Sequence, residues 1–330
     1  MKLLHVTNAY PYAEVPEYGI FVKEQIESVA ASGVDSDLVF MNGRLEGKGA
    51  YLRGIKEIRR KARAADVIHC HHLYSGLATY LAFTGKPIVL SFLNDWLHEM
   101  DGVGSVAVRK ILCNVGVMGA DCVIFKSPIP PQFRGESKFV HLPNGADAQR
   151  FHITDRAPAR ARLGLDPKAF YLLFVSSKDQ FRAQKRYDRF KACVDHLQAA
   201  HPERDVRELI LVNQPRDRVL DFFNAADVHL MTSDFEGSPN SVKEALCCGV
   251  PVVTTDVGNV RDMLDGVPHA YVANAMEPAE LVGLVERLFD APVDRQAIRE
   301  GFLSKGISKE AVLARLIDIY KSLSKQRTLP

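Results

Sequence analysis

The chain contains 330 residues, of which 47% are hydrophobic and 25% are charged. This length suits one large or two medium domains, with enough apolar material to build their cores. The formal net charge of +2 argues against nucleic acid as the main partner, because nucleic-acid binding usually requires a strong basic excess. No apolar run approaches the ~20 residues of a membrane span, and the N-terminus lacks the features of a signal peptide. We therefore expect a cytoplasmic protein.

Short apolar runs alternate with longer segments of helical spacing in the first half of the chain. The runs that we predict as strands are residues 2–8, 35–41, 66–72, 86–92 and 121–127. The intervening segments that we predict as helices are residues 21–32, 50–65 and 75–85.

The second half repeats this alternation. Its predicted strands are residues 169–177, 208–214, 226–233 and 249–256, and its predicted helices are 185–200, 217–226 and 241–248. Nearly continuous apolar strands that alternate with helices are typical of parallel sheets covered on both faces. The pattern lapses over residues 141–158, where Pro, Asn, Gly and Asp gather. We predict an α/β protein with two Rossmann-like domains joined in this segment.

The six cysteines are scattered and form no C-x-x-C pair, and several lie inside apolar runs. We expect buried free thiols in a reducing compartment, without a disulfide or zinc framework. They are Cys70, Cys113, Cys122, Cys193, Cys247 and Cys248.

The stretch EGSPNSVKEALCCGVPVV, residues 236–253, places two carboxylates around a tight turn and a helix start. A helix that opens near Asn240 presents free backbone N–H groups, and the small Gly237 and Ser238 let a phosphate approach the backbone. The carboxylates of Glu236 and Glu244 can accept paired hydrogen bonds from vicinal hydroxyls of a ribose or a sugar ring. The order of these groups predicts a sugar-nucleotide site.

The same region closely resembles a known family signature. Residues 236–264 resemble the C-terminal signature of retaining glycosyltransferases of family 4, which have the GT-B fold. The resemblance continues over residues 18–39, 65–92, 141–151 and 222–240. It implies an acceptor-binding domain over residues 1–143, a nucleotide-sugar-binding domain over 144–308, and a closing helix over 309–330 that packs back toward the first domain.

The resemblance implies roles for residues around the donor. Glu236 would contact hydroxyls of the donor sugar near the reacting carbon, and Glu244 would hold the nucleotide ribose. Backbone N–H groups around Asn240 and Ser241 would touch the diphosphate. Gly19 would let the N-terminal loop approach the donor phosphate. Family members act without a bound metal, so the resemblance implies neither a metal nor another cofactor.

Lys185 matches the lysine of the basic pair with which the family neutralises the leaving diphosphate. The arginine of that pair is not at its usual place, and both Lys178 and Arg182 are candidates to replace it. The family's His-Gly segment of the acceptor domain reads SFLNDWLHE here, with Leu93 and Asn94 where His and Gly are usual. Asp95 remains in this neighbourhood as a catalytic candidate.

Two further groups of residues allow a second interpretation. His69, His71 and His72 are a candidate metal site, although strand alternation sends His72 to the face opposite the other two. One of them is also a candidate for the acceptor pocket. The segment from Arg53 to Arg63 carries six cations. A solvated helix face is the default explanation, and docking on an anionic membrane surface is the alternative.

These observations predict a retaining, metal-independent glycosyltransferase of hexosyltransferase type. It would move a sugar from a UDP- or GDP-sugar to a hydroxyl of a glycan, a lipid-linked acceptor or a small molecule, in bacterial polysaccharide or glycoconjugate biosynthesis. The alternatives are a sugar-nucleotide epimerase or hydrolase on the same fold, and a non-catalytic sugar-nucleotide binder. We expect a cytoplasmic location, with the inner membrane face as the alternative.

Overall fold

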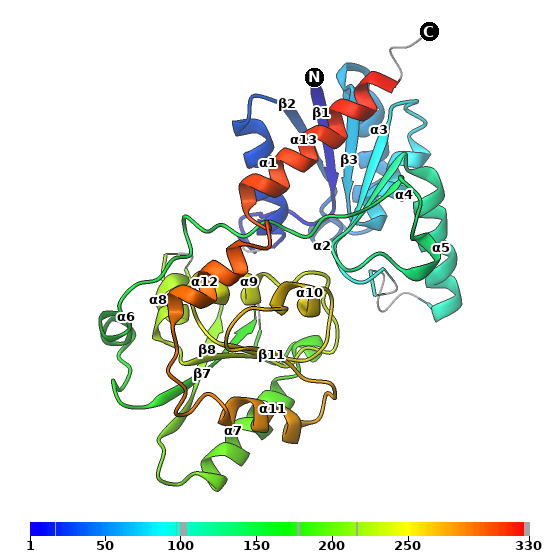
Figure 1. The fold of residues 1–330 in the computed structure, drawn as a ribbon. Helices are drawn as coiled ribbons and strands as arrows, with labels where there is room; N and C mark the ends of the chain where they lie inside the picture. Colours follow the sequence, from blue (N-terminus) through cyan, green and yellow to red (C-terminus); the bar gives the residue numbers. More distant parts are fainter. Residues whose placement is uncertain (17, 97, 100–103, 177–178, 216, 327–330) are drawn as a thin grey trace. The chain divides into compact units, whose positions relative to one another are not determined.

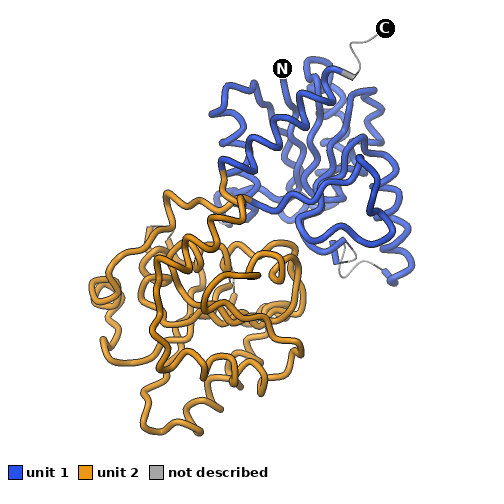
Figure 2. Tube along the Cα trace, in the orientation of Figure 1, with its two compact units in different colours: residues 1–144, 310–330 blue, residues 145–309 orange. Residues whose placement is uncertain are grey.

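The computed structural model describes residues 1–16, 18–96, 98–99, 104–176, 179–215 and 217–326. The chain forms two compact units (Figure 2): unit 1 comprises Met1–Asn144 and Glu310–Pro330, and unit 2 comprises Gly145–Lys309. Each unit is built on one parallel β-sheet (Figure 1). Among the described residues, no helix combines the length and the apolar character that crossing a bilayer requires.

The sheet of unit 1 has six parallel strands in the order β2-β1-β3-β4-β5-β6. Strands β3, β4 and β5 are buried at every position, as expected for strands covered on both faces. The strands are β1 (Lys2–Thr7), β2 (Asp35–Phe40), β3 (Val67–His71), β4 (Ile88–Phe92), β5 (Cys122–Phe125) and β6 (Phe139–His141).

Helices cover both faces of this sheet. One face packs against α3 (Gly49–Lys61), α4 (Leu73–Leu81) and α5 (Val106–Gly119), and the opposite face packs against α1 (Ile20–Ala31) and α13 (Lys309–Gln326). A single helical turn, α2 (Gly43–Glu46), precedes α3. Alternate strand residues supply the two cores, with Leu4 and Ile68 on the first face and Leu3 and Val67 on the second.

The C-terminal helix α13 completes the core of unit 1. Its side chains Val312, Leu316 and Tyr320 are buried against residues of β1, β3, β4 and β5. Tyr320 is fully buried, and its hydroxyl lies 2.6 Å from His69 Nδ1. A helix from the far end of the sequence therefore closes one face of the N-terminal sheet.

Unit 2 has a five-stranded parallel sheet in the order β11-β10-β9-β7-β8. Its strands are β7 (Phe170–Ser176), β8 (Val206–Val212), β9 (Val228–Met231), β10 (Val252–Thr254) and β11 (Ala270–Val272). Its helices are α6 (Arg156–Leu163), α7 (Tyr187–Ala200), α8 (Val219–Ala225), α9 (Asn240–Cys247), α10 (Val260–Leu264), α11 (Pro278–Glu286) and α12 (Arg295–Leu303).

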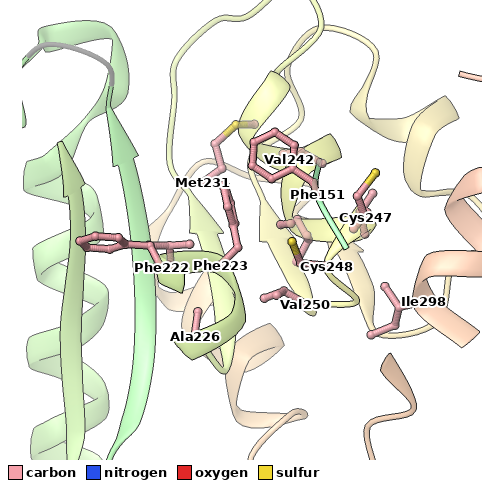
Figure 3. Close-up of a cluster of buried hydrophobic side chains, with 14 of the residues drawn as sticks. Phe151, Phe222, Phe223, Ala226, Met231, Val242, Cys247, Cys248, Val250 and Ile298 are labelled. Atoms are coloured by element: carbon pink, nitrogen blue, oxygen red, sulfur yellow. The ribbon is translucent and has the colours of Figure 1, made fainter. Parts of the chain in front are cut away.

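Two apolar cores flank the sheet of unit 2. The first joins residues of α8, α9, α10 and α12, and Figure 3 shows part of it, with Phe223, Val242 and Ile298. Cys247 and Cys248 lie in this core, and all six cysteines are buried and free, as predicted. The second core joins α7 and α11 on the other face. Helix α9, which carries Glu244, is therefore packed firmly against the first of these cores.

The predicted order of strands and helices is confirmed, with ends that differ by a few residues. Two short edge strands, β6 and β11, were not predicted. Each has three residues, which is too short for an alternation to be visible in the sequence. Helix α5 was also not predicted, because it is apolar on more than one face and so lacks a clear helical stripe.

Candidate functional site

The candidate site lies at the carboxyl end of β9, the central strand of unit 2. The chain leaves β9 at Met231, forms a loop over residues 232–239, and enters α9 at Asn240. Glu236, Gly237 and Ser238 all lie in this loop, and the predicted start of the helix at Asn240 is confirmed. Open parallel sheets bind ligands beyond the carboxyl ends of their strands, so the loop is in the expected place for a ligand.

An ion pair dominates the loop. Lys185 Nζ lies 2.6 Å from Glu236 Oε1, and both side chains are largely buried. The hydroxyl of Ser233 donates to the same carboxylate oxygen at 2.9 Å. The two residues that the sequence analysis placed in catalytic roles, Lys185 and Glu236, are therefore in direct contact. Ser233 was missed, because a serine in a strand-to-loop turn carries no signal of its own.

Backbone and side-chain hydrogen bonds tie the segment that carries Lys185 to the Glu236 loop. Lys185 ends a short 3₁₀ turn, η3 (Ala183–Lys185). Gln184 Nε2 donates to Phe235 O at 2.6 Å, and Asp234 N donates to Gln184 O at 2.9 Å. The Thr232 hydroxyl donates to Lys185 O at 3.0 Å. These bonds hold the ammonium group and the carboxylate together across 51 residues of sequence.

A second lysine lies beneath the start of α9. Lys243 is almost fully buried, and its Nζ donates to the Ser238 hydroxyl at 3.0 Å. A buried ammonium group is costly unless a polar group or an anion compensates it. The Lys243 ammonium group lies next to the N-terminus of α9, where the free backbone N–H groups favour an anion. The sequence analysis did not assign Lys243 a role.

The hydroxyl of Ser241 is engaged by a buried histidine of β9. His229 Nδ1 lies 3.0 Å from Leu173 O and therefore carries the proton, so its Nε2, 3.1 Å from Ser241 Oγ, accepts a hydrogen bond. Burial lowers the pKa of His229 to about 4, so the ring is neutral near pH 7. The hydroxyl of Ser241 already has a structural partner, and the predicted contact of its backbone N–H group with the diphosphate remains a prediction.

Glu244 lies about one turn beyond Asn240 on α9 and is partly buried. Its backbone oxygen accepts from Cys248 N at 3.1 Å, which closes the helix. The residue is therefore carried by the same element that begins at the Glu236 loop. Its ribose-binding role remains a prediction.

The candidates for the second cation of the basic pair differ in position. Arg182 is exposed and immediately precedes η3, where its backbone oxygen accepts from Lys185 N at 2.8 Å. Lys178 lies outside the described residues. Two other guanidinium groups, those of Arg186 and Arg189, are fixed beside the loop by Asp234 at 3.1 and 2.9 Å. The sequence analysis missed them because their partner lies more than 40 residues away.

Gly258, in the loop after β10, packs directly on the Glu236–Gly237 backbone. Its φ is +60°, and a Cβ atom there would lie 2.3 Å from Gly237 O. A left-handed conformation and a backbone neighbour at this distance both require glycine. The sequence analysis assigned no role to Gly258.

Replacing Gly258 with Ala should lower stability by ~1–3 kcal/mol and weaken donor binding, because the Glu236–Gly237 turn must move. Gly266 is a matched control, since its φ is +71° and no atom of the described residues lies within 4 Å of where its Cβ would stand. Gly266→Ala should therefore cost only the backbone strain and leave donor binding unchanged. Urea unfolding and calorimetric titration with donor would measure both effects, and equal donor affinities in the two variants would contradict this role.

Gly19 and Asp95 lie in unit 1. Gly19 caps α1 with φ +67°, and a Cβ atom there would lie 2.3 Å from Ala9 O. This glycine is thus required by a close approach within unit 1, which accounts for it without a donor. Asp95 follows β4 and lies 3.2 Å from His98 Nδ1. The predicted roles of Gly19 at the donor and of Asp95 in catalysis remain predictions.

A buried carboxylate organises the loop after β4. Glu99 accepts hydrogen bonds from Asn94 N at 2.9 Å and from Leu93 N at 3.0 Å, and His72 Nε2 lies 3.8 Å away. Burial raises the pKa of Glu99, while His72 and the backbone N–H groups oppose this shift. Glu99 therefore shapes the segment in which the usual His-Gly pair is replaced. It was missed in the sequence analysis.

Three buried histidines meet on the α13 face of the unit 1 sheet. His5 Nδ1 lies 3.2 Å from His71 Nε2, and the rings of His69 and His71 are 4.0 Å apart. Their nitrogen atoms could hold a metal ion by position. Both nitrogens of His69 already have partners, however, in Tyr320 and Ser91. As predicted, His72 lies apart from the other two strand histidines: it caps α4.

A pocket of about 470 Å³ in unit 2 lies away from this site. Its lining includes Phe170, the first residue of β7, and the ion pair of Arg156 with Asp227. It therefore opens near the amino ends of the strands, where parallel sheets do not usually bind their substrates. We do not assign the donor to it.

Comparison with known proteins shows the fold of the chain and the family that its second half matches. The chain has the GT-B fold: it aligns over 98% of its length with 99% of sucrose-phosphate synthase from Thermosynechococcus elongatus, with a TM-score of 0.77 and 14% identity. Residues 170–291, which hold the candidate site, match the family model for glycosyl transferases group 1. The family that the sequence analysis predicted therefore matches this segment of the chain, and the predicted fold is confirmed.

Among its relatives is D-inositol 3-phosphate glycosyltransferase 1 of Catenulispora acidiphila, which is 25% identical over 78% of this chain and 72% of the relative. A second protein of that description, from Xylanimonas cellulosilytica, is 23% identical over 82% of this chain and 75% of the relative. The structure of Anabaena HepE in complex with UDP aligns with 98% of this chain and 100% of that chain, with a TM-score of 0.70 and 14% identity.

Proposed function

We propose that this protein is a retaining glycosyltransferase, of hexosyltransferase type, that moves a sugar from a nucleotide-diphosphate sugar to an acceptor hydroxyl without a bound metal. The observation that carries the proposal is the ion pair of Lys185 with Glu236 beside the N-terminus of α9. It combines a carboxylate for sugar hydroxyls, a cation for a leaving diphosphate and a helix start for phosphate oxygens.

In this proposal the diphosphate binds at the first turn of α9. The backbone N–H groups of Asn240 and Ser241 donate to its oxygens, and the small Gly237 permits the close approach. Lys243, which is almost fully buried, holds the Ser238 hydroxyl beside this turn. As the bond to the sugar breaks, negative charge grows on the diphosphate, and Lys185 stabilises it. A preorganised cation needs no rearrangement at that moment.

The relatives support only the chemical class of the donor and of the acceptor. HepE, a structural neighbour, was solved in complex with UDP-glucose, which supports a UDP-sugar, with a GDP-sugar as the other candidate. Relatives named as D-inositol 3-phosphate glycosyltransferases support a hydroxylated acceptor. We propose that the reaction belongs to the synthesis of a bacterial polysaccharide or glycoconjugate. A thermal-shift panel of UDP-, GDP- and ADP-sugars tests the base, because a bound ligand raises stability by RT ln(1 + [L]/Kd).

We also propose that α3 contacts an anionic membrane surface. Arg53, Lys56, Arg60 and Arg63 are exposed on this helix and on the turn that follows it. Each cation close to such a surface contributes about 1 kcal/mol of attraction, and the attraction falls with ionic strength.

The two glutamates are expected to differ when each is replaced with alanine. Glu244→Ala should chiefly weaken binding of the nucleotide, because ribose hydroxyls lose their acceptor at a cost of ~1–3 kcal/mol. Glu236→Ala should lower turnover more than donor affinity, because its carboxylate contacts the sugar and also pairs with Lys185. Calorimetric titration with donor and initial rates with acceptor separate the two effects.

Glu203→Ala is the matched control, since this glutamate is exposed and follows α7, remote in sequence from the loop. It should change neither affinity nor turnover. Small and equal effects of Glu236→Ala and Glu244→Ala would overturn the assignment of the site. Release of free sugar or of an epimer at the same rate with and without acceptor would instead support a hydrolase or an epimerase, and donor binding without any turnover would support a binding protein.

A further inference from the structure

Helix α5 exposes large apolar side chains on the face that points away from its own unit's core. Val108, Ile111, Val115 and Met118 recur at spacings of three or four residues and therefore share one face of the helix. Ile111 is 63% exposed and Met118 is 79% exposed. A surface helix normally places polar residues on this side. The opposite, buried face is formed by Cys113, Gly116 and Val117.

The exposed apolar surface continues onto the end of α4. The Tyr80 hydroxyl donates to Gly116 O at 2.6 Å, which fixes the C-terminal end of α4 against α5. Leu81 and Phe83 follow directly and are 57% and 83% exposed. Large apolar side chains exposed on neighbouring elements mark interaction sites with proteins or membranes.

The same surface borders the cationic helix α3. Arg59 Nε donates to Ala82 O at 2.9 Å, so α3 lies beside the end of α4, and α4 lies beside α5 (Figure 1). We call the exposed side chains of α3, of residues 81–86 and of α5 the helical face. All of them belong to unit 1 and to the helix layer that covers one face of its sheet.

The helical face concentrates positive charge in a chain that is nearly neutral. Segments 49–64, 73–86 and 105–119 contain nine Lys and Arg residues and one acidic residue, Glu57, which is a formal charge of +8 against +2 for the whole chain. Two of these cations, Arg53 and Lys61, pair with carboxylates outside the segments. The remaining excess lies in the same helix layer as the apolar stripe, on the other side of α4. Cations combined with an apolar stripe are the composition of elements that lie in a membrane interface.

We propose that the helical face docks on an anionic lipid bilayer, with the apolar stripe of α5 and Phe83 inserted at the interface and the cations of α3 against the headgroups. The inference rests on the lipid contact proposed for α3 and adds the element that inserts. The charge of the helical face favours a bilayer over a second copy of the chain as its partner. Two copies of a face this basic repel each other, whereas anionic headgroups attract it. Self-association through this face is an outcome that the test separates.

The test is co-sedimentation of the full chain with phosphatidylcholine vesicles that contain or lack phosphatidylglycerol. The wild-type protein should bind the anionic vesicles and bind neutral ones weakly. The triple variant Ile111→Ser, Val115→Ser, Met118→Ser should lower partitioning into anionic vesicles about tenfold or more. The triple variant Lys56→Ser, Arg60→Ser, Arg63→Ser should remove the dependence on phosphatidylglycerol and on salt.

Controls outside the helical face separate specific effects from general changes of the surface. Phe181→Ser with Met276→Ser removes exposed apolar side chains of unit 2, and Lys168→Ser with Arg218→Ser removes exposed cations there. Neither pair should change partitioning. Insertion is read directly from Phe83→Trp in a Trp96→Phe background, whose fluorescence should shift to the blue and be quenched by brominated lipid.

Each other outcome overturns the proposal. The α5 variant could retain salt-sensitive binding while the Phe83→Trp protein shows no fluorescence shift. This result would support the α3 contact and refute insertion of α5. Absence of binding to either vesicle would refute both. Self-association that the α5 variant abolishes, in place of vesicle binding, would make the face a protein interface. Donor binding measured on the same variants should be unchanged, so failure here is distinct from failure of the transferase proposal.

Discussion

Replacing Lys185 with alanine is expected to lower turnover at least ~100-fold, the scale on which removal of one charge-stabilising group acts. The ammonium group lies 2.6 Å from Glu236 and is held there by hydrogen bonds between η3 and the loop. Its loss removes the cation that meets the leaving diphosphate. It also leaves the largely buried Glu236 carboxylate with the Ser233 hydroxyl as its remaining side-chain partner among the contacts described above.

Single-turnover kinetics on donor and acceptor should be compared for Lys185→Ala, Lys185→Arg, Arg182→Ala and Lys178→Ala. The arginine variant keeps the charge and should recover part of the rate. We expect Arg182→Ala to cost nearly as much as Lys185→Ala, and Lys178→Ala less, since a guanidinium fork suits phosphate oxygens. Thermal unfolding of each variant controls for misfolding. A fully active, folded Lys185→Ala protein would show that the chain does not use this mechanism.

Mild acidification is expected to destabilise unit 1 strongly. Burial lowers the pKa of His5 from 6.5 to about 4, and it lowers the pKa values of His69 and His71 well below 6.5. The folded unit therefore keeps these rings neutral, whereas the unfolded chain takes up protons below pH ~6.5. Their contribution is complete above that pH and is lost as the pH falls from 6.5 toward 4.

The size of the pKa shifts gives the expected loss of stability. Between pH ~6.5 and ~5, a histidine that stays neutral in the folded state loses ~2 kcal/mol of stabilisation, so three of them approach half of a typical domain stability. Lys126, which is buried in the same unit, affects stability in a different pH range. Burial lowers its pKa from 10.5 to about 7, so its contribution grows as the pH rises from 7 to 10.5 and is constant below 7.

Urea unfolding at a series of pH values from about 7 to about 5, with hydrogen exchange to locate the loss, would measure this dependence. Strands β1 and β3 should lose protection before β8 of unit 2. His5→Gln should reduce the slope of stability against pH by close to one proton. His201→Gln is the control, because Glu286 raises the pKa of this histidine and its contribution has the opposite sign. An unchanged slope in His5→Gln would refute the explanation.

Much of the architecture could be predicted from local patterns. Continuous apolar strands such as residues 86–92 can only be buried on both faces, which implies a parallel sheet with helices on each side. The turn-and-helix start at Gly237–Asn240 is a local property of small residues followed by a helix former. For these reasons the alternation of most strands and helices, the loop that carries Glu236 and the start of α9 were predicted from the sequence.

Partners far apart in the chain could not be predicted, because only tertiary packing brings them together. The sequence by itself determined that Lys185 and Glu236 are candidate site residues, and the structure decided that they touch, across 51 residues. It also decided that Gly258 packs on Gly237, and that Tyr320 of the last helix bonds to His69 of the first sheet. Burial of charge depends on the whole fold, and this is why Lys243 and Glu99 emerged only from the tertiary structure.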